Sequence, residues 1–366
     1  MMTIRRLIYR EVIAAVVFVA AGFLALFFFF DFVDELPNVG DSATPYRLTQ
    51  ALVYVSLMVP NHLYELLPIA VLIGTIFVMA RLAQSSEYTI LRTSGLGPWR
   101  ALRALLALGL MFTLLTFAAG DYLAPAADRA GQLLRAKSQG RLSVGQTGAW
   151  LKERQLLHTY NVNVSALTPD GAMQGVRIFE ADERGFLVTM TQAPRATFAD
   201  GAWVLEDAER TRFLTRDAAL PQVERSKLER LRWPTEISNE MVSVALLRPD
   251  RMSTIDLFQY INHLEENGQT SQRYEIEFWR KVFYPLSCLV MVVLALPFAY
   301  LHFRSGGITT YVFGGVLIGI SFFLLNNVFG YIGNLRSWSP WLTAAAPGLI
   351  YSVVSLGAFG WLVLRR

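Results

Sequence analysis

Ionisable residues close to apolar stretches are the first candidates for chemistry in this sequence. His62 and Glu65 stand three positions apart, which resembles half of a metal-binding helix, but no third ligand accompanies them. Asp31 and Asp121 are the best pair for an acidic dyad, yet each lies at the end of an apolar run, where carboxylates are readily solvated. Phosphate-loop, zinc-helix and nucleophile-elbow motifs are missing from the sequence. We therefore expect a chain that is not itself an enzyme and that binds no metal or cofactor of its own.

Glu65 is the most unusual ionisable residue, because it lies inside an apolar stretch. A carboxylate at membrane depth is a functional candidate by default. Pro60 and Pro68 flank it and predict a kinked helix. Two interpretations remain open: a residue that contacts a substrate, or a hydrogen-bonded carboxylate that lines a helix bundle. With Asp31 and His62, it completes our set of intramembrane candidates.

Membrane-length apolar segments surround these residues. A helix needs about 20 apolar residues to cross about 30 Å of hydrocarbon, because its backbone must satisfy its own hydrogen bonds there. The chain is 53% hydrophobic with a mean hydropathy of +0.36, which is too apolar for an ordinary soluble protein of 366 residues. Its single cysteine, Cys288, excludes an intrachain disulfide. Six spans are predicted: Val12–Val33, Leu52–Ala80, Ala101–Leu123, Val282–Phe303, Ile308–Gly333 and Trp341–Leu364.

Arginines in the short connections predict the orientation of these spans. Positive charges concentrate on the cytoplasmic side of membrane proteins. With the N-terminus inside, the short outer connections carry only Arg47 and Arg336, and a formal charge of +4 fits basic inner loops. We expect both termini inside and the polar middle of the chain outside. The inner arginines are Arg5, Arg6, Arg10, Arg81, Arg92, Arg100, Arg103, Arg304, Arg365 and Arg366.

The polar middle of the chain is predicted to be a β domain. Short alternating runs are separated by turn signals such as Thr168-Pro-Asp-Gly and Asp182-Glu-Arg-Gly, which is typical of hairpins in a sandwich or jelly-roll-like sheet. The predicted fold class is an α+β membrane protein: six transmembrane helices, three on each side of an inserted β-jelly-roll-like domain. The domains are 1–139, 140–254 and 255–366. The runs are Leu156–Val164, Gly175–Ala181, Phe186–Gln192 and Arg195–Phe198, and Ile255–Gly268 returns to helical periodicity.

The inner connection 84–97 predicts a short helix. Glu87 falls in its first turn, where the helix dipole favours an anion, and Gly95 can end it. The segment could lie on lipid head groups as an amphipathic helix. Alternatively, it could be a coupling helix that docks onto a nucleotide-hydrolysing partner. The residues alone leave both open. The face that would dock contains Tyr88, Leu91 and Arg92, at positions i, i+3 and i+4.

Motifs along nearly the whole chain resemble one family, the lipopolysaccharide-export permeases LptF and LptG, and more closely its LptG type. The resemblance implies six spans and a periplasmic β-jelly roll in the inner membrane of a Gram-negative bacterium. The motifs are Phe32-Val-Asp-Glu-Leu, Val59-Pro60, Leu67-Pro68, the loop from Leu82 to Gly95, Ala124-Pro125, the segment from Gly268 to Tyr274 and Lys281-Val-Phe-Tyr-Pro-Leu.

The same resemblance implies roles for particular residues. Glu87 matches a coupling-helix glutamate that pairs with a cation of the ATPase, with Arg92 and Gly95 shaping the end of that helix. Some family members carry a lysine where this chain has Asp31, so a head-group contact there is in doubt. A basic stretch beyond the third span would bind phosphates of the glycolipid head group, since guanidinium groups pair well with phosphate; its cations could instead merely solvate a helix. They are Arg129, Arg135, Lys137 and Arg141.

Two further sets of residues fit a transporter of this kind. Gly315 and Gly319 form a small-xxx-small pattern, which is typical of close helix packing and would suit a lateral gate against the partner permease. A path for acyl chains would need apolar side chains on the β domain. Alternation cannot distinguish an open groove from a closed dry core. The candidates are Trp150, Ile178, Phe186, Val188, Phe198 and Trp203.

The implied partners are an LptF-type permease, a dimeric LptB ATPase that binds ATP and Mg, LptC and a periplasmic LptA bridge. Lipopolysaccharide is the implied substrate, and no nucleic acid is expected. A MacB-like ATP-driven permease is an alternative, but such proteins usually divide their spans one plus three around the external domain. A non-transport membrane scaffold or sensor with a periplasmic binding domain is the other alternative.

Overall fold

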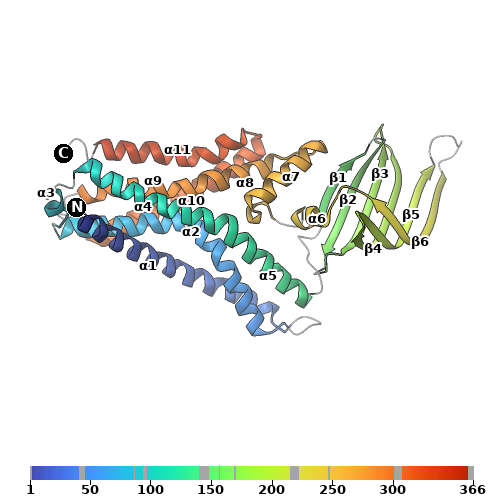
Figure 1. Ribbon diagram of the computed structural model, residues 1–366, viewed down its shortest axis with the longest axis horizontal. Helices are drawn as coiled ribbons and strands as arrows, with labels where there is room; N and C mark the ends of the chain where they lie inside the picture. The colour runs from blue at the N-terminus through green and yellow to red at the C-terminus, as the bar shows by residue number, and fades with distance from the viewer. Residues whose placement is uncertain are drawn as a thin grey trace. The chain divides into compact units, whose positions relative to one another are not determined.

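The computed structural model describes residues 2–40, 46–85, 87–93, 97–139, 148–155, 157–168, 170–214, 222–245, 248–300 and 307–361. The chain divides into two compact units (Figure 1). The helical unit comprises Met1–Glu35, Val55–Ala127 and Glu275–Arg366. The sheet unit comprises Leu36–Tyr54 and Asp128–Tyr274.

Long apolar helices form the helical unit. The described residues contain six helical segments long and apolar enough to cross a membrane, three before the strands and three after them. The six predicted spans are therefore confirmed, and the chain is a multi-pass membrane protein. The helices are α1 (Met2–Glu35), α2 (Leu48–Gln84), α4 (Pro98–Ala118), α5 (Ala124–Gln139), α8 (Gln272–Phe283), α9 (Ser287–Ala295), α10 (Ile308–Arg336) and α11 (Pro340–Phe359).

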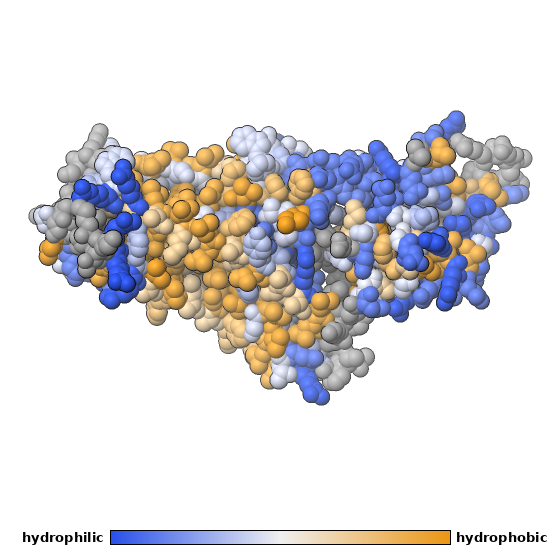
Figure 2. Space-filling model, viewed as in Figure 1, coloured by the Kyte–Doolittle hydropathy of each residue, from blue (hydrophilic) through white to orange (hydrophobic). Residues whose placement is uncertain are grey.

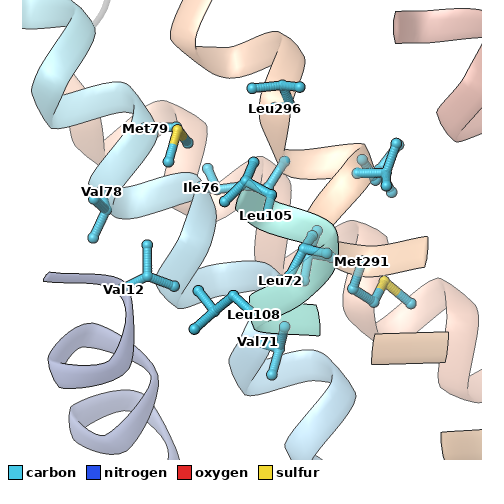
Figure 3. Packing of buried hydrophobic residues seen from close by; sticks show 14 of the residues in the cluster. Val12, Val71, Leu72, Ile76, Val78, Met79, Leu105, Leu108, Met291 and Leu296 are labelled. Carbon is cyan, nitrogen blue, oxygen red and sulfur yellow. The ribbon is translucent and has the colours of Figure 1, made fainter. Parts of the chain in front are cut away.

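Helix α2 supplies much of the core of the helical unit. Its Leu72 and Ile76 are fully buried, and they belong to one cluster with Leu105 and Leu108 of α4 and Met291 of α9 (Figure 3). By contrast, α1 and α10 leave most of their apolar windows uncovered. Figure 2 shows apolar residues over much of the visible helical surface and hydrophilic residues over the strands. Such uncovered apolar faces suit contact with lipid or with another membrane protein.

The inserted domain is a single antiparallel sheet in which every strand pairs with its neighbour in sequence. The predicted α+β membrane fold with an inserted β domain is confirmed. The described strands form a meander, whereas a jelly roll in the strict sense is built from Greek-key connections. The strands are β1 (Ala149–Arg154), β2 (His158–Leu167), β3 (Met173–Asp182), β4 (Leu187–Ala199), β5 (Ala202–Leu214) and β6 (Gln222–Pro234).

The register places apolar residues on one face of this sheet. Leu151 pairs with Val162, which pairs with Ile178, and all three are buried. Directly opposed residues of neighbouring strands lie on the same face. We call this face the inner face. Two helices, α6 (Asn239–Ala245) and α7 (Thr254–Glu266), belong to the same cluster of buried side chains.

The sheet also curls, so that residues from its two edges meet. The rings of Tyr160 on β2 and Trp233 on β6 lie 6.0 Å apart. The carboxylate of Glu153 on β1 accepts hydrogen bonds from the hydroxyl of Thr235 and, at 3.1 Å, from the backbone N–H of Glu236, both just beyond β6. Since β1 and β6 stand at opposite ends of the strand order, these contacts require strong curvature.

Candidate functional site

The short helix α3 (Glu87–Thr93) occupies the predicted coupling segment. Glu87 is its first residue and is exposed, as the helix-dipole argument requires. Tyr88 is buried, and its ring packs edge-on against Tyr300 at 5.2 Å. Tyr88 therefore faces the chain's own core. The side chains of Leu91 and Arg92, and the whole of Gly95, lie outside the described residues.

Among the described side chains of α3, the outward face includes Glu87, which was predicted to meet the ATPase, together with residues that were not predicted to dock. Ile90 is 62% exposed, and it shares its side of the helix with Glu87 and Thr93, three positions away in either direction. Sequence reasoning missed Ile90, although its spacing from Glu87 could have indicated it. An acidic residue beside an uncovered isoleucine is a combination suited to docking a protein with a cationic, partly apolar groove.

Arg129, the first of the four head-group candidates, already has an anionic partner. Its guanidinium donates to the carboxylate of Asp256, which also forms a capping box with Ser253 at the start of α7. Burial raises the pKa of Asp256, but the hydrogen bonds from Ser253 and Arg129 outweigh it, and the net shift is downward. Arg135 and Lys137 lie on α5 with side chains outside the described residues, and Arg141 lies outside them altogether.

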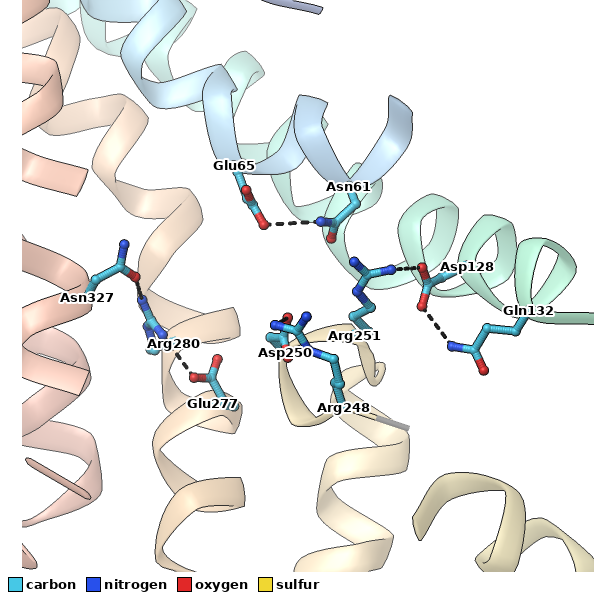
Figure 4. A network of polar contacts seen from close by, with 10 residues as sticks. All are labelled: Asn61, Glu65, Asp128, Gln132, Arg248, Asp250, Arg251, Glu277, Arg280 and Asn327. Carbon is cyan, nitrogen blue, oxygen red and sulfur yellow. Dashed lines mark hydrogen bonds and ion pairs between the residues drawn. The ribbon is translucent and has the colours of Figure 1, made fainter. Parts of the chain in front are cut away.

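A second ion pair accompanies the first. Arg251 donates to the carboxylate of Asp128, which also accepts a hydrogen bond from Gln132 at 3.1 Å (Figure 4). Both members of the pair are largely buried. The adjacent residues Asp128 and Arg129 of α5 thus each pair with an opposite charge. Asp128 binds Arg251, which precedes α7, and Arg129 binds Asp256, which lies within α7. Sequence reasoning missed Arg251, because nothing in the spacing of these charges indicates which of them meet.

Two of the three intramembrane candidates lie together. The Nε2 atom of His62 on α2 is 2.6 Å from a carboxylate oxygen of Asp31 on α1, and both side chains are mostly buried. The ring of Phe27 lies against the imidazole, with centroids 4.9 Å apart. The pair joins the first two spans. The third candidate, Glu65, accepts a hydrogen bond from Asn61 at 3.1 Å, one turn earlier on the same helix (Figure 4).

A buried lysine lies beside an irregular turn of the third span. Residues Ala119–Leu123 form a π-helical turn between α4 and α5. Such turns free backbone groups from the regular helical ladder and often mark functional sites. Lys281 of α8 is only 6% exposed; its ammonium group donates to the carbonyl of Gly120 at 2.8 Å and lies 5.7 Å from the Tyr64 ring centre. Its neighbour Arg280 binds Glu277 at 2.9 Å and Asn327 at 3.0 Å (Figure 4).

The two glycines of the small-xxx-small pattern pack inside the chain. A Cβ atom on Gly315 would lie 2.8 Å from Ile76, and one on Gly319 would lie 2.8 Å from Ile69. Both isoleucines belong to α2. The glycines therefore permit close contact between α10 and α2, as the pattern predicts for close helix packing; a role at a gate to another subunit stays a prediction.

The six acyl-path candidates occupy different parts of the sheet. Ile178 and Trp203 are buried at the inner face, and Phe198 is 39% exposed with its ring 5.1 Å from that of Trp203. Trp150 is exposed on the opposite face, where it stacks on Phe179. Phe186 is exposed in the turn before β4, and Val188 is half-buried where the register between β3 and β4 shifts. The structure thus brings together only Ile178, Phe198 and Trp203 on one face.

Comparisons with known proteins agree with this architecture. Residues 6–365 match the family model described as lipopolysaccharide export system permease LptF/LptG. A similar protein is the lipopolysaccharide export system permease protein LptG of Escherichia coli (strain K12), which is 28% identical over 340 residues that cover 92% of this chain and 90% of the relative. The LptG protein of Haemophilus influenzae is 25% identical over 368 residues, which cover 100% of this chain and 99% of that relative. The chain therefore belongs to the LptF/LptG family of lipopolysaccharide export system permeases.

Proposed function

We propose that this chain is the LptG-type permease subunit of an ATP-driven machine that extracts lipopolysaccharide from the inner membrane. The observation that carries the proposal is the family match over residues 6–365, together with relatives named LptG that align over nearly their whole length. The division of six spans into three before and three after one inserted sheet supports it. The same division disfavours a MacB-like permease with one plus three spans.

Energy would come from a partner, since the sequence carries no phosphate-binding loop. The partner is a dimeric LptB-type ATPase that holds ATP and Mg, while this chain holds no cofactor. The exposed face of α3, with Glu87 and Ile90, is its docking surface on this subunit. The carboxylate would pair with a cation of the ATPase, and the isoleucine would enter an apolar part of the same groove.

The remaining partners follow from the direction of export. A second permease of the LptF type would cover the uncovered apolar faces of this subunit and complete the cavity for the lipid. The arginine distribution supports cytoplasmic termini and a periplasmic sheet unit. On that side LptC and the LptA bridge would receive the lipid. Among the cations beyond the third span, Arg135 and Lys137 are our main candidates for the phosphorylated head group, because Arg129 is bound to Asp256.

Copurification and reconstitution test this function. The chain is expressed with candidate ATPase and second-permease subunits, purified in detergent and inserted into vesicles that contain lipopolysaccharide. We expect the three proteins to copurify and lipopolysaccharide to leave the vesicles for a soluble acceptor only when ATP is hydrolysed. A stable complex that hydrolyses ATP without releasing lipopolysaccharide would favour a different substrate. A chain that recruits no ATPase would favour the scaffold or sensor alternative.

A further inference from the structure

Helix α1 is attached to the core of the helical unit along one narrow stripe. The stripe recurs every four residues, so its members lie on one face of the helix. All of them belong to the buried cluster to which α2 contributes most. Among the described residues of α1 after Ala20, no apolar side chain belongs to that cluster. The second half of α1 therefore leaves its apolar side chains to lipid or to another protein. The members of the stripe are Ile8, Val12, Val16 and Ala20.

An ion pair joins α1 to α2 beside this stripe. A guanidinium nitrogen of Arg81 donates to the carboxylate of Glu11 at 2.7 Å. The same guanidinium group lies 6.0 Å from the ring centre of Phe77, one turn earlier on α2. Apolar burial is non-directional, whereas a hydrogen bond between two charged groups requires a particular geometry. The stripe thus holds α1 against α2, and the ion pair fixes how the start of α1 is placed on α2.

Arg81 also lies at the junction between α2 and the short helix α3. It is in the last turn of α2, which ends at Gln84, and α3 begins at Glu87. The backbone carbonyl of Arg81 accepts hydrogen bonds from the N–H and the hydroxyl of Ser85, at 3.0 and 3.1 Å. Figure 1 shows α3 and the start of α1 at the same end of the helical unit. One residue therefore binds α1 through its side chain and the residues leading to α3 through its backbone.

The exposure of this ion pair argues against a mainly stabilising role. The side chain of Arg81 is 42% exposed and that of Glu11 is 27% exposed. Ion pairs that remain in contact with solvent contribute little to the free energy of unfolding, because water already solvates both charges. What the pair supplies is a defined placement of α1 relative to the end of α2. Its loss should therefore disturb what depends on that placement more than it disturbs folding.

We propose that the Glu11–Arg81 ion pair links α1 to the ATPase-docking helix α3, so that a force exerted on α3 reaches α1. Glu11 and Arg81 are positioning residues in this scheme, since they act through the two helices and not on nucleotide or lipid. The uncovered face of α1 is the part of the subunit that would pass the force to the second permease. This inference rests on the proposed function, because it assigns a route between the docking surface and that face.

The number of lipid molecules released per ATP hydrolysed tests this link. The complex with the ATPase and the second permease is reconstituted in vesicles that contain lipopolysaccharide, and hydrolysis and release to a soluble acceptor are measured together. Glu11→Gln and Arg81→Gln should each assemble and hydrolyse ATP at nearly the wild-type rate, but release several-fold less lipopolysaccharide per ATP. Arg81→Lys keeps the charge and should retain most of the release. Arg6→Gln removes a cation from an exposed position of α1 and is the control that should leave the ratio unchanged.

Reversal of both charges tests whether the two residues act as a pair. In Glu11→Arg with Arg81→Glu, opposite charges meet again at the same place, whereas either reversal alone brings like charges together. Residues that act through their mutual contact show effects that do not add. We expect the double variant to release several-fold more lipopolysaccharide per ATP than either single reversal. A double variant that folds and binds the ATPase but is coupled no better than the single reversals would overturn the proposal.

The same measurements separate this link from a merely structural role and from the proposed function. A structural role would lower the melting temperature or the amount of bound ATPase while the release per ATP stayed at the wild-type value, and that result would overturn the link. The wild-type ratio in both glutamine variants would also overturn it, and the proposed function would stand. If the wild-type complex hydrolyses ATP and releases no lipopolysaccharide, the proposed function fails, and the link falls with it.

Discussion

Glu87 and Tyr88 are neighbours in sequence with opposite environments. A helix of seven residues is too short to be stable by itself, so α3 depends on its contact with the rest of the chain. Tyr88 provides that contact through Tyr300, which leaves Glu87 and Ile90 available to a partner. Within this short helix, Tyr88 thus stabilises the helix, whereas Glu87 and Ile90 would bind a partner protein.

Substitutions in α3 should separate these two roles. Glu87→Lys should abolish association with the ATPase, because it reverses the charge at the docking surface and places a cation at a helix N-terminus. Membrane insertion and thermal stability should stay unchanged. Tyr88→Ala should instead lower the melting temperature of the purified subunit, since it removes a buried ring. Pull-down and thermal unfolding measure the two effects; an intact ATPase complex with Glu87→Lys would contradict the docking surface.

His263 in α7 predicts a pH dependence for the sheet unit. Its Nδ1 atom lies 3.2 Å from the amide nitrogen of Asn267. Burial lowers its pKa from the ordinary value of 6.5, although Glu153, Glu266 and Glu236 oppose the shift. The unfolded chain therefore binds a proton more readily than the folded one. Stability is fully present above about pH 6.5 and falls as the pH drops below it.

The change that tests this is His263→Gln, which replaces the titrating imidazole with an uncharged amide that can still form hydrogen bonds. Thermal unfolding is followed from about pH 7.5 to about pH 5. Over this range the wild type has the imidazole of position 263 to protonate, and the variant does not. We expect the melting temperature of the wild type to fall more steeply than that of the variant. Parallel pH profiles for the two proteins would show that His263 is not responsible.

For single residues, the sequence shows which ionisable side chains are unusual, but it does not show which groups they contact. Asp31, His62 and Glu65 were recognised because charges in apolar segments are rare. The pairing of Asp31 with His62 could not be predicted, since it depends on how two long helices are rotated against each other. Arg251 and Lys281 were missed for the same reason: Lys281 bonds to the backbone carbonyl of Gly120 in a π-helical turn that the sequence does not indicate.

Among the elements, α2 is in close contact with two other spans, α1 and α10. A Cβ atom on its Gly74 would lie 2.8 Å from the backbone of Val16 on α1, and its isoleucines meet the glycines of α10. Its side chains in this region leave no void for an added methyl group. Tightly packed interiors respond to extra volume by shifting helices, which costs about 1–3 kcal/mol.

Gly319→Val should therefore destabilise the helical unit, because its new Cβ would overlap Ile69. Gly314→Val is the matched control on the same helix, where a Cβ meets nothing within 4 Å. We expect the first variant to lose about 1–3 kcal/mol and the second to stay within a fraction of that. Unfolding in detergent measures both, and combination with Ile69→Ala should recover part of the loss. Equal stability of the two valine variants would contradict the packing.

Elements with strong local signals were predicted well. The turn signal at Asp182 is confirmed: its carboxylate accepts from the N–H groups of Arg184 and Phe186 at 3.0 and 2.9 Å. Helical periodicity from Ile255 corresponds to α7. The runs Phe186–Gln192 and Arg195–Phe198 form one strand, β4, because Pro194 is tolerated there without ending the pairing. Helix α6 had no signal of its own, since its position is determined by the sheet that it covers.

For the whole molecule, six spans and an inserted sheet follow from hydropathy and alternation alone, because length and period are properties of the sequence. The curl of the sheet does not follow from these sequence patterns. It depends on contacts such as that of Glu153 with Thr235, which are 82 positions apart. The family motifs identify the permease family, whereas the sequence does not show which cations are already paired within the chain, as Arg129 is with Asp256.

Loss of head-group binding is the prediction at this scale. Arg135→Ala with Lys137→Ala should lower photocrosslinking of lipopolysaccharide by the reconstituted complex several-fold. Little loss of stability is expected if the two cations bind the head group rather than the folded chain, because charges at a surface contribute little to folding. Arg177→Ala with Arg184→Ala removes the same charge from exposed positions of the sheet unit and should leave the yield unchanged. Equal yields from both double variants would show that the stretch beyond the third span only solvates a helix.

The contact between Ile76 and Gly315 has a consequence for the order of events during synthesis. The two residues are separated by about 240 positions, which a ribosome covers in about 10 to 50 s at ordinary elongation rates. Throughout that interval the side of α2 that faces α10 is uncovered, while the whole sheet unit is still being translated. Until α10 is inserted, this side of α2 must be prevented from making non-native contacts with other membrane helices. A membrane chaperone or the partner permease would be in place to shield it, so assembly of the complex could begin before the chain is complete.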